Sequence, residues 1–244
     1  KVLLQQNLCV AAGKALPICQ DTGMACVFIE LGQDVHINGN LDEAVNEGVR
    51  RGYEKAYLRK SITADPLQRV NTGDNTPAFL TVHLVPGDVC KITVAPKGAG
   101  SENMSRLTML KPADGVQGVK DFVMETVKQA GANPCPPIVL GIGIGGSFDK
   151  CAALAKKALL RPLDQPNADP YYAALEKELL AVVRSSPELK FHSIFRHSSH
   201  SYNNKASFAY IYPFCEAALY IHQLPASLLT SIEADFYLQN KMMH

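Results

Sequence analysis

The stretch ICQDTG at residues 18–23 is followed directly by the apolar stretch MACVFIEL at residues 24–31. Pro17 restricts the backbone before the polar stretch, and Gly23 allows it to turn afterwards. The apolar stretch has the composition of a β-strand. Because buried polar groups each need a partner, a cysteine, an amide, a carboxylate and a hydroxyl in a row favour a functional loop at the end of this strand. The alternative is a tight polar turn with an inert thiol.

The rest of the chain alternates between helical and strand patterns. Residues 79–85 and 89–94 are separated by Pro86-Gly87-Asp88, which predicts an antiparallel hairpin, and residues 138–146 predict a buried strand. Periodicity and capping residues predict helices over residues 1–15, 41–57, 116–130, 147–160 and 171–184. Together these patterns predict an α/β fold with mixed, largely antiparallel sheets and flanking helices.

Composition narrows the functional class. The 244 residues carry a net charge of +1, so charge gives no case for nucleic acid or a membrane surface. We expect no membrane span, because no apolar run approaches about 20 residues, and no leader peptide. The seven cysteines are odd in number and widely spaced, which favours free thiols in a reducing cytoplasm over a disulfide scaffold.

Several loops have compositions suited to a site. Residues 71–77 are turn residues throughout, residues 97–103 form a small-residue loop, and residues 133–137 place Cys135 on a proline-rigidified elbow. The glycines within residues 141–146 spell GxGxxG. We discount a dinucleotide fingerprint there, because two of the glycines fall inside the expected strand and no suitable acidic residue follows about 20 positions on.

The character of the chain changes after Ser185. All 17 glycines lie at or before Gly146, whereas five of the seven histidines lie within residues 192–244. We therefore expect residues 1–184 to carry the recognisable domain, and residues 185–244 to form a divergent segment of that same domain.

Seven motifs follow one another in the chain: ICQDTG, YLRKS, NTGDNTPA, KGAGSEN, MLKPADG, NPCPP and GIGIGGSFDK. In this order they resemble the iron–sulfur class I fumarate hydratase family, in its α subunit or N-terminal half, over roughly residues 1–184. The α subunits of L-tartrate dehydratases share much of this framework. The resemblance implies a hydro-lyase that interconverts fumarate and L-malate, with L-tartrate dehydration as the alternative; the wording of ICQDTGMA and YLRKS leans toward fumarate.

The resemblance also implies a cofactor. Family members hold a 4Fe-4S cluster through three cysteines and leave one iron open to act as a Lewis acid. Cys19 matches the first ligand position and Cys135 the second. The family's third ligand segment has no match after residue 184, where Cys215 is the cysteine that remains.

Further site residues are implied by the same motifs. Gln20 and Asp21 match catalytic positions beside the cluster, Arg59 matches a clamp for a substrate carboxylate, and Gly100 would contact substrate through its backbone. The expected partners are a small dicarboxylate substrate and a β subunit carrying the general base, which makes the protein a hetero-oligomer.

Two readings from other classes stay open. One is a cluster-free nucleotide-binding protein that uses the glycines of residues 141–146. The other is a stable but inactive remnant, because residues 185–244 lack the family's motifs.

Overall fold

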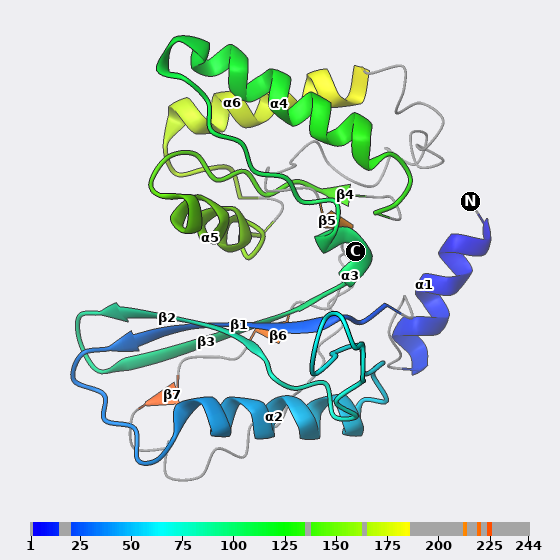
Figure 1. Ribbon diagram of the computed structural model, residues 1–244, viewed down its shortest axis with the longest axis vertical. Coiled ribbons are helices and arrows are strands. Elements are labelled where there is room, and N and C mark those ends of the chain that lie inside the picture. The colour runs from blue at the N-terminus through cyan, green and yellow to red at the C-terminus, as the bar shows by residue number, and fades with distance from the viewer. Residues whose placement is uncertain are drawn as a thin grey trace. The chain divides into compact units, whose positions relative to one another are not determined.

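The computed structural model describes residues 2–14, 21–134, 138–162, 165–185, 212–213, 219–220 and 224–225. The chain divides into two compact units, which we describe separately: Val2–Ala99 together with strands from the end of the chain, and Gly100–Phe214. Figure 1 shows helices and a mixed sheet, so the predicted α/β class is confirmed.

The first unit is built on a mixed sheet. Its central strand is β1 (Met24–Gly32), which pairs in parallel with β2 (Phe79–Val85) and antiparallel with β3 (Val89–Lys97). The short strands β6 (Leu219–Tyr220) and β7 (Leu224–Pro225) pair antiparallel with β3. The apolar stretch that follows ICQDTG therefore supplies the central strand of this sheet.

The predicted hairpin of residues 79–94 is wrong in its pairing, although both strands exist. β1 lies between β2 and β3, so the connection at residues 86–88 passes over the end of β1 instead of joining neighbours. Gly32 makes this crossing possible, because a Cβ there would lie 2.2 Å from the Gly87 carbonyl oxygen. Alternation in the sequence identifies a strand but not the strand beside it.

Helix α2 (Leu41–Lys55) packs against this sheet (Figure 1). It begins where the Asn40 side chain accepts hydrogen bonds from the N–H groups of Asp42 and Glu43, at 3.0 and 3.3 Å. The packed residues of helix and sheet are Ala25, Val27, Ile29, Val49, Tyr53, Cys90 and Val94. α1 (Val2–Lys14) precedes the sheet and agrees with the predicted helix.

The second unit is mainly helical. It contains α3 (Ala99–Glu102), a 3-10 turn (Pro112–Asp114), α4 (Gly115–Ala130), β4 (Ile138–Val139), α5 (Phe148–Ala158), α6 (Pro170–Ser185) and β5 (Tyr212–Pro213). α4 and α6 share an apolar core that includes Val127 and Leu179, and β4 pairs antiparallel with β5. Of the helices that the structure describes, none is long and apolar enough to cross a membrane.

Three sequence predictions need correction here. The strand expected over residues 138–146 is limited to Ile138–Val139. Residues 140–147 have no regular structure, and Gly143 lies so close to α5 that a Cβ there would lie 2.1 Å from the Cys151 carbonyl oxygen. The small-residue loop at residues 97–103 contains the short helix α3. α2 ends at Lys55, before residues 56 and 57.

Candidate functional site

The loop that leads into β1 is bonded to the segment that carries Arg59. The Thr22 hydroxyl accepts a hydrogen bond from the Arg59 N–H at 2.9 Å and donates one to the Arg59 carbonyl at 3.3 Å. Thr22 is buried, and its neighbour Asp21 is half-buried. The Arg59 residue is exposed, so its main chain is fixed while its side chain faces solvent. This pair of hydrogen bonds holds the main chain of Arg59 against Thr22, the residue that follows Asp21.

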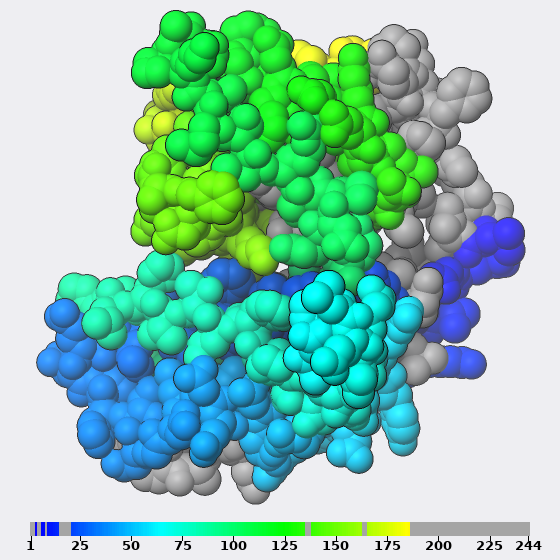
Figure 2. All heavy atoms as spheres, viewed as in Figure 1, coloured from blue at the N-terminus to red at the C-terminus, as the bar shows by residue number. Residues whose placement is uncertain are grey.

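Asn75 connects the same two segments. Its side-chain oxygen accepts from the N–H groups of Ser61 (2.6 Å) and Ile62 (3.1 Å), and its amide nitrogen donates to the Gly23 carbonyl at 3.0 Å. Asn75 is fully buried and has a left-handed φ of 65°, a conformation that asparagine adopts more readily than most residues. The segment of residues 60–75 forms a compact protrusion, cyan in Figure 2.

Tyr53 of α2 adds a third support. Its hydroxyl lies 3.2 Å from the carbonyl oxygens of both Thr22 and Gly23. Burial raises the pKa of Tyr53, so the phenol keeps its proton and remains a donor at neutral pH. The turn before β1 is thus held from α2 as well as from the loop of residues 71–77.

Two glycines allow the ICQDTG and KGAGSEN motifs to approach each other closely. A Cβ at Gly23, whose φ is 60°, would lie 1.8 Å from the Lys97 carbonyl oxygen. In return, a Cβ at Gly98 would lie 2.9 Å from Oδ2 of Asp21. The Asp21 carboxylate therefore lies against the α-carbon of Gly98. Lys97, at the end of β3, is 8% exposed, and its ammonium donates to the Gly98 carbonyl at 2.8 Å.

The loop of residues 71–77 is attached to α2 by a charged contact. Asp74 accepts hydrogen bonds from the Thr76 hydroxyl (2.7 Å) and N–H (3.0 Å), and from Arg50 Nε at 2.9 Å. The pKa of Asp74 lies well below its usual range, mainly because of the Thr76 hydroxyl and then because of the Thr76 N–H and Arg50. Asp74 is therefore ionised at neutral pH and stabilises the loop that presents Asn75.

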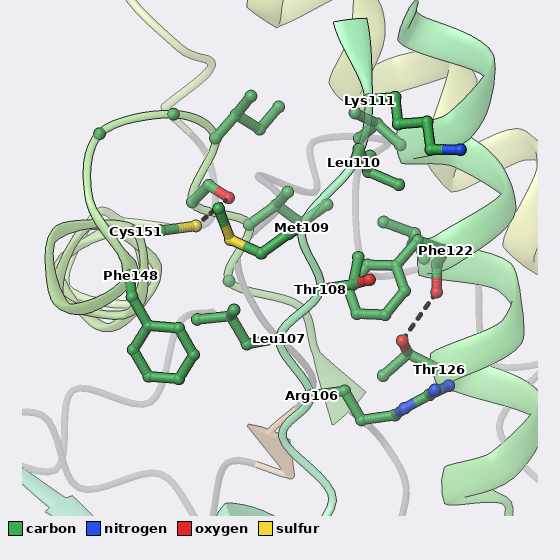
Figure 3. Close-up of a pocket in the computed structure, with 18 of the residues that line it drawn as sticks. Arg106, Leu107, Thr108, Met109, Leu110, Lys111, Phe122, Thr126, Phe148 and Cys151 are labelled. Atoms are coloured by element: carbon green, nitrogen blue, oxygen red, sulfur yellow. Dashed lines mark hydrogen bonds between the residues drawn. The ribbon is translucent and has the colours of Figure 1, made fainter. Parts of the chain in front are cut away.

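The second unit contains a cavity of about 410 Å³. Figure 3 shows Leu107 and Met109 lining it from the segment before α4, Phe122 from α4 and Phe148 from α5. The thiol of Cys151 lies at its wall and donates to the Gly143 carbonyl at 3.1 Å, while burial raises the pKa of that thiol. The lining is mostly apolar, and it includes glycines of residues 141–146.

The remaining predicted residues are distributed as follows. Gly100 lies in α3, at the start of the second unit. Cys19, Gln20, Cys135 and Cys215 lie outside the described residues, as do most residues after 185. Within the described part of the chain, no group of three His, Cys, Asp or Glu side chains could hold a metal ion. Cys26 and Cys90 are buried in strands of the first unit, where they serve packing.

The comparisons with known proteins agree with the resemblance that the motifs carry. A family model described as fumarate hydratase (fumerase) matches residues 2–186. The chain belongs to the fumarate hydratase family. Its match covers both units, including Asp21, Arg59 and Asn75 of the first and the cavity of the second.

Several proteins similar to this chain are named as tartrate dehydratase subunits. A protein of Methanocaldococcus jannaschii named "Putative L(+)-tartrate dehydratase subunit alpha" is 43% identical over 193 residues, covering 76% of this chain and 67% of its own length. The L(+)-tartrate dehydratase subunits alpha of Escherichia coli and Shigella sonnei are 35% and 34% identical over 167 residues, 67% of this chain and 55% of theirs. The chain thus spans about half to two thirds of the length of these relatives.

Thr22 and Asn75 hold this arrangement together through bonds that the sequence did not reveal. The Thr22 hydroxyl was predicted only as part of a functional loop, and Asn75 only as a turn residue. A turn residue that bonds across the fold looks the same in sequence as one that bonds locally. The signal that was available is the recurrence of amide and hydroxyl residues in NTGDNT, more than one turn requires.

Proposed function

We propose that the protein is the α subunit of a hydro-lyase that interconverts L-malate and fumarate. The observation that carries the proposal is the pair of hydrogen bonds between Thr22 and the N–H and C=O of Arg59, which holds the Arg59 segment against the residue that follows Asp21. L-Tartrate is the second candidate substrate, because the similar proteins of Methanocaldococcus and Escherichia are named for it. Both substrates are four-carbon dicarboxylates with a hydroxyl beside a carboxylate.

The roles of the described residues follow from their chemistry. The Arg59 guanidinium has two parallel N–H groups suited to one substrate carboxylate. Asp21, held against Gly98, would orient the departing water or relay its proton. Gly100 would offer a main-chain contact to substrate, and Gln20 a polar one.

We further propose that Cys19 and Cys135 each contribute a thiolate to a 4Fe-4S cluster. Thiolates suit such clusters, and in the sequence both cysteines lie within two positions of a proline, which restricts the backbone around them. When bound, the cluster would supply an open iron that polarises the substrate hydroxyl. A third thiolate is required, for which Cys215 is the candidate in residues 185–244, and a β subunit would supply the general base. A cytoplasmic location fits the use of free thiols.

The test is an activity assay of the chain co-expressed anaerobically with a family β subunit. We expect conversion of L-malate, of L-tartrate, or of both. Arg59→Lys keeps the charge but loses the paired donors, so KM should rise at least about 10-fold. Asp21→Asn keeps the shape, so kcat should fall by roughly 100-fold while iron content is retained. An assembled, iron-loaded complex that converts neither substrate contradicts the proposal, and its inertness would favour the inactive remnant.

A further inference from the structure

Lys97 is a buried cation to which the proposed function has given no role. It ends β3 and is 8% exposed, whereas the side chain of Lys91 in the same strand is 54% exposed. A buried ammonium is costly, and an apolar side chain of similar length could fill the same place without that cost. The charge of Lys97 is therefore better explained by its effect on neighbouring groups than by packing.

Both Lys97 and Asp21 contact Gly98. The Lys97 ammonium donates a hydrogen bond to the Gly98 carbonyl at 2.8 Å. A Cβ on Gly98 would lie 2.9 Å from Oδ2 and 3.3 Å from Cγ of Asp21. The cation thus holds the carbonyl of the residue whose α-carbon supports the carboxylate. The place that the Asp21 carboxylate occupies therefore depends on how the Gly98 peptide is oriented.

The main chain at Gly98 is packed against Gly23. A Cβ at Gly23 would lie 1.8 Å from the Lys97 carbonyl oxygen and 2.7 Å from the Gly98 α-carbon. Gly23 is itself held by the hydrogen bond that its carbonyl accepts from Asn75. Gly98 has no side chain to restrict its own backbone, so a bond from outside is needed to fix its carbonyl. The Lys97 ammonium supplies that bond, and bonds from charged donors are among the stronger ones.

We infer that Lys97 is a positioning residue for Asp21, which acts by holding the Gly98 peptide against which the carboxylate lies. This inference rests on the proposed function, in which Asp21 orients the departing water or relays its proton. Small displacements of a reacting group reduce turnover strongly. The carboxylate contact proposed for Arg59 is separate from this one. Loss of the Lys97 ammonium should therefore lower kcat and leave KM nearly unchanged.

The experiment compares wild type, Lys97→Met and Lys91→Met in the iron-loaded complex with a β subunit. Methionine nearly keeps the length of the side chain and removes the ammonium. Lys91 is the matched control, because it lies in the same strand and pairs with Glu30 at 3.2 Å on the surface. We expect Lys97→Met to keep its iron, to lower kcat by about 10- to 100-fold and to change KM less than about 3-fold. It should melt no more than about 4 °C below wild type, and Lys91→Met should match the wild-type kcat.

A double-mutant cycle separates action through Asp21 from an independent role. If Lys97 places the Asp21 carboxylate, Lys97→Met should change kcat by less than about 3-fold in an Asp21→Asn background, because the group that it positions is already altered. A residue that only stabilises the fold, or that acts on another part of the site, would cost the same factor in both backgrounds.

Several results would overturn the inference. They are an unchanged kcat in Lys97→Met, a rise in KM in place of the fall in kcat, an equal fall in Lys91→Met, the same factor lost in the Asp21→Asn background, full activity of Asp21→Asn alone, and loss of the melting transition in Lys97→Met. In each case the wild-type complex is active, so the proposed hydro-lyase function stands. A wild-type complex that converts neither substrate overturns the proposed function, and the inference with it.

Discussion

At the scale of single residues, the contact between Asp21 and Gly98 can be altered by adding one methyl group, without replacing Asp21. The backbone of Gly98 is outside the left-handed region, and a methyl group there meets mainly the end of the Asp21 side chain, at 2.9 Å. Gly98→Ala should therefore displace the carboxylate but spare the fold. Because small misplacements of reacting groups are costly, we expect kcat to fall by about 10- to 100-fold in the assembled enzyme.

The control for that substitution is Gly13→Ala, since a methyl group at Gly13 meets nothing within 4 Å. Its kcat should equal that of the wild type. A Gly98→Ala variant with full activity would show that the position of Asp21 is not critical. A variant that loses its melting transition would show that the contact is structural.

Asp74 leads to a prediction about pH. Its pKa is lowered in the folded protein, chiefly by the Thr76 hydroxyl, so the charged form is favoured on folding. The resulting stabilisation is complete above the unfolded-state pKa of about 3.9, and it is lost as pH falls toward the lowered folded-state value. Asp74→Asn should cost about 1 kcal/mol at pH 7, with a smaller difference from wild type near pH 3. Denaturant unfolding at both pH values measures this, and an equal difference at both would contradict it.

The sequence identified Asp21 and Arg59 as candidate site residues, but not the hydrogen bonds that connect their segments. Their motifs are chemically conspicuous, and the resemblance gave each a role. The contacts through Thr22 and Asn75 connect segments 37 and 52 positions apart in the chain, a separation for which composition carries no signal.

At the scale of secondary-structure elements, helices were predicted better than strand pairing. α4 and α6 agree with their predicted ranges within one residue at each end, because each presents a periodic apolar face to a shared core. The sheet was different: β2 and β3 were recognised as strands, but β1 separates them. The alternation of β2 and β3 is compatible with pairing to each other or with pairing to β1. Gly32, which has no side chain, lets the connection between them cross the end of β1.

Gly32→Ala tests that crossing. The added methyl group would lie within 2.9 Å of three main-chain atoms of residues 87 and 89, so backbone has to move. We expect a loss of roughly 2–3 kcal/mol in unfolding free energy, measured by denaturant unfolding. Gly13→Ala again serves as the comparison, and it should be neutral or stabilising as an alanine within a helix. A fully stable Gly32→Ala protein would mean that the connection does not pass over β1.

At the scale of the whole molecule, the proposed chemistry combines residues from distant parts of the chain. Asp21 and Arg59 lie within one unit. The proposed thiolates, Cys19, Cys135 and Cys215, lie outside the described residues. The family match ends at residue 186, and the division into residues 1–184 and 185–244 stays a prediction. Iron binding is therefore the measurement that addresses the chain as a whole.

We expect the complex with a β subunit, assembled anaerobically, to bind about four iron atoms per chain, as a 4Fe-4S cluster requires. Cys19→Ala and Cys135→Ala should reduce iron to background, because two thiolates at most would remain. Cys26→Ala, a buried strand residue, should keep its iron and is the matched control. Cys215→Ala decides the third position: loss of iron assigns Cys215 as a ligand, and retention assigns the third thiolate elsewhere. Iron retained in both Cys19→Ala and Cys135→Ala would contradict the proposed cluster, since each variant lacks one of its three thiolates.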